Sequence, residues 1–182
     1  EAEKYAAETG KDPRLVELVL QESSRVLRHR FGSIVVEHKL GFVHANAGID
    51  QSNLPGNADS ECALLLPENP DASAQALRQA LEEKHAVNIG VVINDSFGRA
   101  WRLGTVGIAI GVAGFDPLLD LRGAPDLFGR TLEITQVGIG DEIAAAASLL
   151  MGQAGEGVPV VIVRGLQLTT TEGTVQTLLR KP

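Results

Sequence analysis

The seven residues VNIGVVI at positions 87–93 include five apolar, β-branched side chains and no charged residue. Such a run predicts a strand that is buried on both faces. Working outward, the glycine-interleaved run VGIAIGV at 106–112 predicts a second strand, and the runs at 132–137 and 159–163 predict two more, the last of them buried. Apolar residues on either side of a turn at 39–41 predict a short hairpin.

Helices are expected between these strands. A capping Asp-Pro pair at 12–13 and apolar residues at helical spacing predict a helix over about 13–30. A second helix, capped by Asp71, is expected to bury Leu77 and Leu81 and to end near residue 85, and an alanine-rich third is expected over 142–151. Since strands and helices mix without strict βαβ alternation, we expect an α+β fold of mixed sheets with packed helices.

Composition excludes several classes of protein. With 182 residues, the chain has the length of one domain, or of two small ones that share a core. The net charge of −7 has the wrong sign for a broad nucleic-acid-binding face, and the apolar runs fall short of the ~18 residues that a membrane span needs. The single cysteine, Cys62, is expected to be packed, and the expected location is the cytoplasm.

Common nucleotide and zinc motifs are missing from the sequence. It contains no P-loop signature, no HExxH and no paired cysteines. Gly138-Ile139-Gly140 imitates half of a dinucleotide fingerprint, but residue 143 is isoleucine where the fingerprint has glycine. The alternative is a turn that places Asp141 and Glu142 in the first turn of a helix, where carboxylates favour its dipole.

Two polar stretches could carry chemistry. In the first, Asp95 and Ser96 are expected to end the buried strand, with Arg99 and Arg102 close behind. A carboxylate there can hold a hard cation, and guanidinium groups can bind phosphate or carboxylate oxygens. The alternative is an Asx-type turn in which Asp95 pairs with one arginine. The second stretch, residues 46–53, offers the carboxylate of Asp50 and several amides, which suit Mg²⁺ or Mn²⁺ better than zinc, or form a plain polar turn.

Taken together, these and further stretches resemble the coenzyme F420-0:gamma-glutamyl ligase family. The stretches that carry the resemblance are GFV at 41–43, ANAGIDQSN at 45–53, LLP at 65–67, PDASA at 70–74, DSFGRAWRLG at 95–104, AIGVAG at 109–114, DEIAAA at 141–146, MGQ at 151–153 and VRG at 163–165. Their order along the chain, from about residue 11 to 165, makes the resemblance more specific than any single motif.

The resemblance implies the fold of this family and an acid–amino-acid ligase activity of the EC 6.3.2 type. Such an enzyme uses GTP to add L-glutamate to the terminal carboxylate of the deazaflavin precursor, coenzyme F420-0, through an acyl phosphate. Mn²⁺ or Mg²⁺ is implied as the cofactor, with K⁺ as a further candidate, and a homodimer is implied as the assembly. Neither nucleic acid nor a membrane is expected as a partner.

The resemblance also implies site residues. Asp50 and Asp95 match the metal-binding carboxylates, Asn53 and Ser96 match GTP-contacting positions, and a further nucleotide-binding loop, in which Gln153 could also reach a metal, matches Gly152, Gln153, Ala154, Gly155, Glu156, Gly157 and Val158. With Asp50 and Asp95, Arg99 completes the expected catalytic set. Arg99 and Arg102 are expected to hold phosphate or the acidic precursor, and His44 is a candidate substrate contact.

The sequence departs from the family pattern at a few places. Asn94 and Ser96 stand where the family commonly has threonine, and Ala100 stands where it has proline; the serine keeps the hydroxyl. The family's N-terminal segment, which carries a lysine- and serine-containing motif, would precede Glu1. We therefore expect residues 1–165 to be a ligase domain that lacks this segment, and 166–182 to be a peripheral tail. In some relatives a flavin-binding domain follows.

Two rival functions remain at this point. One is a non-catalytic nucleotide-binding or assembly domain of the same fold, which the missing N-terminal segment favours and the presence of Asp50, Asp95, Asn53 and Arg99 opposes. The other is an oxidoreductase that uses the turn at Gly138, for which nothing else in the sequence speaks.

Overall fold

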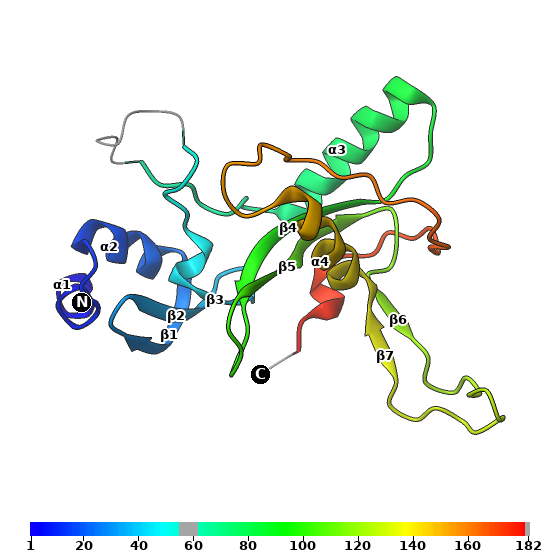
Figure 1. Ribbon diagram of the computed structural model, residues 1–182, viewed down its shortest axis with the longest axis horizontal. Coiled ribbons are helices and arrows are strands. Elements are labelled where there is room, and N and C mark those ends of the chain that lie inside the picture. The colour runs from blue at the N-terminus through cyan, green and yellow to red at the C-terminus, as the bar shows by residue number, and fades with distance from the viewer. Residues whose placement is uncertain (55–61, 181–182) are drawn as a thin grey trace. The chain divides into compact units, whose positions relative to one another are not determined.

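The computed structural model describes residues 1–54 and 62–180 and divides into two compact units. The first unit comprises residues 1–68 and 97–105, and the second comprises residues 69–96 and 106–182. Each unit mixes helices with small sheets (Figure 1), and no strict βαβ alternation occurs along the described chain. The predicted α+β class is therefore confirmed.

The first unit is a three-stranded sheet with two helices packed against its first strand. Its elements are α1 (Ala2–Thr9), α2 (Pro13–Gln21), β1 (Ser23–Arg30), β2 (Ser33–His38), β3 (Val43–Ala45) and the short 3-10 helix η1 (Asn46–Gly48). The strands are antiparallel in the order β1-β2-β3, with Val36 of the central strand opposite Val26 and His44. The β2–β3 pair confirms the predicted hairpin.

The predicted helix over 13–30 is wrong in its second half. Asp12 caps α2 as expected, because its carboxylate accepts a hydrogen bond from the Arg14 N–H at 2.8 Å, but the helix ends at Gln21. Residues 23–30 form β1, where pairing with β2 overrides the helical spacing of the apolar residues. The Ser23 hydroxyl donates to the Val19 carbonyl and so satisfies one carbonyl of the last helical turn.

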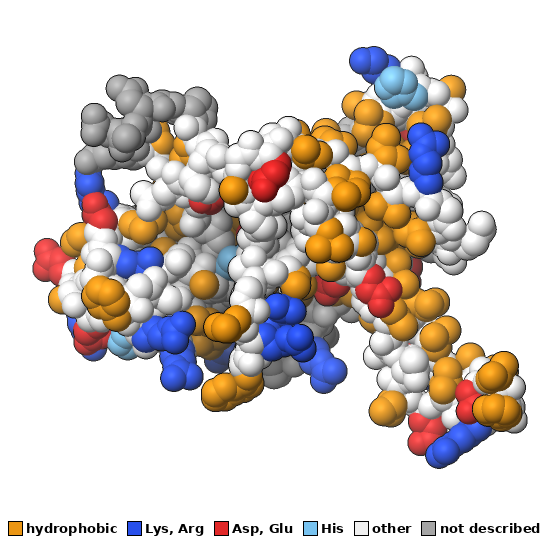
Figure 2. All heavy atoms as spheres, in the orientation of Figure 1, with side chains coloured by type: hydrophobic (Ala, Val, Ile, Leu, Met, Phe, Trp, Pro, Cys, Tyr) orange, Lys and Arg blue, Asp and Glu red, His pale blue; other side chains and the backbone are white. Residues whose placement is uncertain are grey.

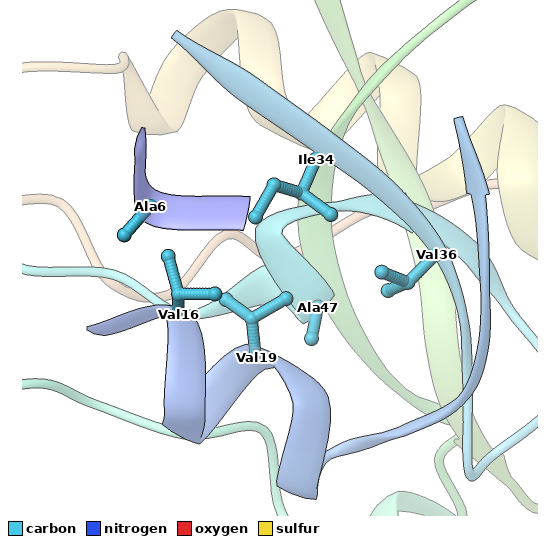
Figure 3. Close-up of a cluster of buried hydrophobic side chains, with 6 residues drawn as sticks. All are labelled: Ala6, Val16, Val19, Ile34, Val36 and Ala47. Atoms are coloured by element: carbon cyan, nitrogen blue, oxygen red, sulfur yellow. The ribbon is translucent and has the colours of Figure 1, made fainter. Parts of the chain in front are cut away.

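The core of the first unit lies between α1, α2, β2 and η1. Its buried members are Ala6, Val16, Val19, Ile34, Val36 and Ala47 (Figure 3). In β2 the side chains alternate, with Ile34, Val36 and His38 buried and the residues between them half-buried. Burying each Val or Ile side chain contributes about 1.5–3 kcal/mol, so this small cluster accounts for much of the unit's hydrophobic stabilisation.

His38 is the buried polar side chain at the end of β2, and it is 3% exposed. Its Nδ1 accepts a hydrogen bond from the Leu40 N–H at 3.0 Å, while its Nε2 lies 3.7 Å from the Glu22 carboxylate, too far for a hydrogen bond. Burial lowers the pKa of His38; His44 and Lys39 lower it further, and Glu22 acts in the opposite direction. His38 is therefore held in its neutral form with the proton on Nε2.

The second unit carries two strand pairs and two long helices. Its elements are α3 (Pro70–His85), β4 (Val91–Gly98), β5 (Thr105–Ala113), β6 (Leu118–Asp120), β7 (Gln136–Gly138), α4 (Ile139–Met151) and the 3-10 helix η2 (Val175–Leu178). β4 pairs with β5, and β6 pairs with β7 in antiparallel register; the last residues of β4 and the first of β5 fall in the first unit. The structure confirms the predicted end of α3 and the predicted strand β5. It also confirms the predicted helix α4, which begins three residues earlier than expected.

Small residues in β5 allow the two helices to pack directly on the strand. A Cβ on Gly107 would collide with the Ala144 carbonyl of α4, and one on Gly111 would collide with the Pro70 carbonyl at the start of α3. These glycines therefore set the close approach of helix and strand, which explains the glycine-interleaved pattern of β5.

Side chains from the helices also satisfy the backbone N–H groups of β5. The Ala109 N–H donates to Asp141 of α4 at 3.0 Å, and the Val112 N–H donates to Asp71 of α3 at 2.8 Å. Asp71 also accepts from the Val175 N–H of η2 at 3.1 Å. Burial raises the pKa of Asp141, and the Ala109 N–H partly opposes that shift. Asp141 and Glu142 lie in the first turn of α4, as predicted for a turn at Gly138.

Other predictions for the second unit need correction. The N-cap of α3 is Asn69, whose side chain accepts from the Ala72 N–H, so Asp71 is left to bind β5. Leu77 and Leu81 are exposed. The strand predicted at 87–93 begins at residue 91, is half-buried and continues to 98, while the one predicted at 132–137 shrinks to Gln136–Gly138. Each error arises because packing partners, which periodicity does not contain, fix burial and strand ends.

Two apolar segments stay exposed. Residues 159–163 form no strand, contrary to prediction, and Val160 and Ile162 are about three-quarters exposed, because no described strand pairs with them. The connection between β6 and β7 forms an arm (Figure 1), and apolar side chains gather at its end (Figure 2), where Leu127 and Phe128 are about nine-tenths exposed. In the first unit, Cys62 is also exposed, which contradicts the prediction that it is packed.

Candidate functional site

Asp50 lies on a loop whose backbone is fixed from both sides. Its N–H and carbonyl pair with Leu64 at 3.0 and 2.7 Å, and Asn46 at the start of the loop accepts from the Ile34 N–H at 3.2 Å. Gly48 has a φ of 68° and lies against Leu66, so its backbone conformation favours glycine and a Cβ there would meet that leucine side chain. The loop therefore presents the Asp50 side chain from a fixed backbone.

The Asp50 carboxylate is exposed and is oriented by its own loop. It accepts hydrogen bonds from the Ser52 N–H at 2.8 Å and from the Ser52 hydroxyl at 2.7 Å, which form an Asx turn. Asn53 follows in the left-handed region with a φ of 53° and is also exposed. Ser52 was not among the predicted site residues, although an Asp-x-Ser spacing is a signal for such a turn. The Ser52 hydroxyl also lies 2.9 Å from the second carboxylate oxygen, so the local bonds reach both oxygens of Asp50.

Asp95 and Ser96 are half-buried residues inside β4, whereas the sequence predicted them at a strand end. The Asp95 carboxylate accepts a hydrogen bond from the Ser96 N–H at 2.7 Å. Because β4 continues to Gly98, a strand rather than a loop holds both side chains, which makes their positions more rigid than predicted.

Arg99 and Arg102 lie on the connection between β4 and β5. The Arg99 guanidinium donates from Nη2 to the Leu103 carbonyl at 3.1 Å, while its buried Nε has no hydrogen-bond partner among the described residues. Arg102 is exposed, and its N–H donates to the Arg99 carbonyl at 3.3 Å. Arg99 thus ties its own loop together, and Arg102 is the more accessible cation for an anionic ligand.

His44 belongs to a small aromatic cluster of the first unit. Its Nδ1 lies 2.8 Å from the Ala45 carbonyl and donates to it, which places the ring proton on that nitrogen. The His44 ring packs edge-on against Phe97, with 3.9 Å between the ring centroids. Phe97 packs edge-on against Phe42, with 6.0 Å between the centroids. Neither aromatic residue was predicted at the site: Phe97 contacts the His44 ring directly, and Phe42 in turn contacts Phe97.

The predicted nucleotide-binding loop directly follows α4. Gly152, with a φ of 74°, ends the helix, and its N–H donates to the Ser148 carbonyl at 3.1 Å. Residues 153–158 are exposed, and the Glu156 carboxylate folds back to accept from the Ala154 N–H at 2.8 Å. Backbone N–H groups of Ala154, of Glu156 itself and of Gln153 lower the pKa of Glu156.

The predicted residues are divided between the two units. Asp50, Asn53, His44, Arg99 and Arg102 belong to the first unit, and Asp95, Ser96 and the loop at 152–158 belong to the second. Within the described residues, no three His, Cys, Asp or Glu side chains gather closely enough to hold a metal ion by themselves. Two carboxylates with one amide oxygen, the predicted ligand set, remain chemically suited to Mg²⁺ or Mn²⁺.

Comparison with known proteins gives a consistent result. The family model described as F420-0:Gamma-glutamyl ligase matches residues 1–165. The coenzyme F420:L-glutamate ligase of Methanothermobacter thermautotrophicus is 50% identical over 99% of this chain and 71% of its own length. Proteins of the same name from Methanococcus maripaludis (strain C7) and Methanocaldococcus jannaschii are 46% and 44% identical over 100% and 99% of this chain, and over 71% and 70% of their own lengths.

Over the part of the chain that the structure describes, no helix has both the length and the apolar character needed to cross a bilayer.

Proposed function

Because this chain belongs to the F420-0:Gamma-glutamyl ligase family, we propose that it is a ligase of coenzyme F420 biosynthesis that joins L-glutamate to coenzyme F420-0 with GTP as the phosphoryl donor. The observation that carries the proposal is the 50% identity with a coenzyme F420:L-glutamate ligase over 99% of the chain. The presence of every carboxylate, amide and guanidinium named above supports it.

The proposed reaction has two steps. A carboxylate oxygen of coenzyme F420-0 attacks the γ-phosphorus of GTP, the bond to the bridging oxygen breaks, and GDP leaves. The glutamate amine then attacks the carbonyl carbon of the acyl phosphate, inorganic phosphate leaves with the electron pair of the broken C–O bond, and the amine loses a proton. Such chemistry depends on positioning and on neutralising charge more than on a protein nucleophile.

Each group of residues has a proposed role in this reaction. Asp50, Asp95 and Gln153 would hold Mn²⁺ or Mg²⁺, and their oxygen atoms are the donors that such hard cations prefer. When bound, a divalent cation neutralises charge on the phosphate oxygens. Asn53, Ser96 and the loop at 152–158 would bind the nucleotide, and Arg102, with Arg99 as the organiser of its loop, would bind the acidic precursor. His44 would contact the substrate.

A homodimer is the proposed assembly. The exposed apolar segment at 158–163 supports it, since Val160 and Ile162 would be covered by a second copy. Light scattering should give twice the monomer mass, and replacing both residues with serine should shift the protein toward the monomer. A monomeric wild-type protein at micromolar concentration would refute this assembly.

The test of the proposed function is product formation. The chain is incubated with coenzyme F420-0, L-glutamate, GTP and Mn²⁺, and mass spectrometry detects a glutamyl adduct together with GDP. We expect Asp95→Asn to abolish the product and Asp126→Asn, a half-buried carboxylate that accepts hydrogen bonds within the β6–β7 arm, to leave it unchanged. A metal-dependent thermal shift with GTP but no product would instead support the rival nucleotide-binding module. GTP at about 100 times its Kd stabilises a protein by about 2.7 kcal/mol.

A further inference from the structure

The loop after α4 encloses a carboxylate that belongs to the loop itself. Glycines with positive φ stand at both ends of the curled segment, Gly152 at 74° and Gly157 at 66°. Between them the Glu156 side chain folds back against Gly152, and its Oε2 accepts from the Ala154 N–H at 2.8 Å. The groups that lower the pKa of Glu156 are all backbone N–H groups of its own loop.

Backbone N–H groups that converge on one point form a nest, which binds anions through fixed partial charges. Carboxylate and phosphate oxygens both accept such hydrogen bonds. Residues 152–158 contain no lysine or arginine, so the attraction for an anion comes from the N–H groups alone, while Glu156 is the only charged side chain of the segment. Any phosphate that enters must therefore displace the Glu156 carboxylate or share the nest with a like charge.

We propose that Glu156 is an internal placeholder: its carboxylate fills the anion nest formed by the N–H groups of Gln153 and Ala154 and swings out when a nucleotide phosphate binds. The inference rests on the proposed function for the identity of the anion, and it adds a competitor built into the nucleotide loop. The apparent affinity for phosphate is then reduced by the fraction of time for which the nest is filled. In the absence of nucleotide the placeholder also keeps the glycine-rich loop in one conformation.

Two variants and one control test the proposal. Glu156→Ala removes the placeholder, and Glu156→Gln keeps its size but removes its charge. Glu172→Gln removes one negative charge from an exposed position of the same unit and serves as the control for general electrostatics. Binding of GTP with Mn²⁺ is measured by calorimetry, and binding of inorganic phosphate is followed through the backbone amide NMR signals of Gln153 and Ala154. Circular dichroism confirms that all variants are folded.

We expect Glu156→Ala to bind both GTP and phosphate at least about threefold more tightly than the wild type, the value for a nest that is filled two-thirds of the time. Glu156→Gln should show a smaller gain, and Glu172→Gln should match the wild type. Equal or weaker GTP binding by Glu156→Ala would overturn the placeholder while leaving the proposed function intact. If neither the wild type nor any variant binds GTP, the proposed function fails, and the phosphate titration alone tests the placeholder. Gln153 and Ala154 signals that stay unchanged when phosphate is added to Glu156→Ala would then overturn the placeholder as well.

Discussion

Replacing Asp71 with alanine should destabilise the second unit far more than the loss of one surface charge would. Its carboxylate accepts from the N–H groups of Val112 and Val175 at 2.8 and 3.1 Å, and these two residues are only 1% and 2% exposed. A buried N–H left without an acceptor costs about 1–3 kcal/mol. Two of them, together with a helix-dipole contribution of about 0.3–1 kcal/mol, give an expected loss of about 3 kcal/mol once some relaxation is allowed.

The assay is thermal unfolding followed by calorimetry or circular dichroism. For a chain of this size, a loss of about 3 kcal/mol should lower Tm by roughly 6–12 °C. Asp71→Asn keeps the Oδ1 acceptor that both N–H groups use, so its loss should be about 1 kcal/mol or less. Glu142→Ala removes an exposed first-turn carboxylate of α4 and reports the dipole contribution alone. If Asp71→Ala and Glu142→Ala lower Tm equally, the tether does not stabilise the fold and the reasoning is refuted.

Two further predictions concern packing and pH. Gly111→Ala should destabilise the protein by about 1–3 kcal/mol or more, because its Cβ would meet the Pro70 carbonyl, whereas Gly98→Ala, with open space around it, should be nearly neutral in urea unfolding. Because the pKa of buried His38 is lowered below 6.5, the unfolded chain binds its proton first as the pH falls. The free energy of unfolding is therefore independent of this group above about pH 6.5. As the pH falls from there through the lowered pKa of His38, it decreases by up to about 1.4 kcal/mol per pH unit. In a pH series of unfolding curves, His38→Gln should lose this slope, and a slope that persists unchanged in the variant would count against the assignment.

Local signals made some elements readable from the sequence alone. The predicted end of α3 and the predicted bounds of β5, which interleaves glycine with apolar residues, lie close to the observed ones, whereas the cap of α3 is Asn69 and not the predicted Asp71. The segment at 23–30 was predicted as helix because its apolar spacing is ambiguous, and only its pairing with β2 makes it a strand. Likewise, the apolar run at 159–163 indicates a segment that favours burial, but its sequence does not specify which surface would bury it.

The candidate site follows a similar division. The residue types at Asp50, Asp95 and the loop at 152–158 could be recognised because family motifs are linear. The sequence also indicates the polar loop that holds Asp50 and the loop after α4, but it places Asp95 at a strand end, whereas the structure has it inside β4. The turn from Asp50 to Ser52 could have been predicted from the sequence, since only one residue separates the two. The hydrogen bond from the Ala154 N–H to the Glu156 carboxylate could not have been predicted in this way, because it depends on the backbone path that Gly152 and Gly157 permit.

Hydrogen-bond range separates two kinds of carboxylate in this chain. Asp71 and Asp141 accept from N–H groups 41 and 32 residues away, so they join elements together and their loss should be felt in folding. Asp50 and Glu156 accept from N–H groups two residues away, so each is oriented by its own segment and stabilises little beyond it. A carboxylate satisfied locally keeps lone pairs for a ligand and can exchange partners without unfolding the protein. Substitutions in the second group should therefore change binding while leaving Tm nearly unchanged, and those in the first group should do the reverse.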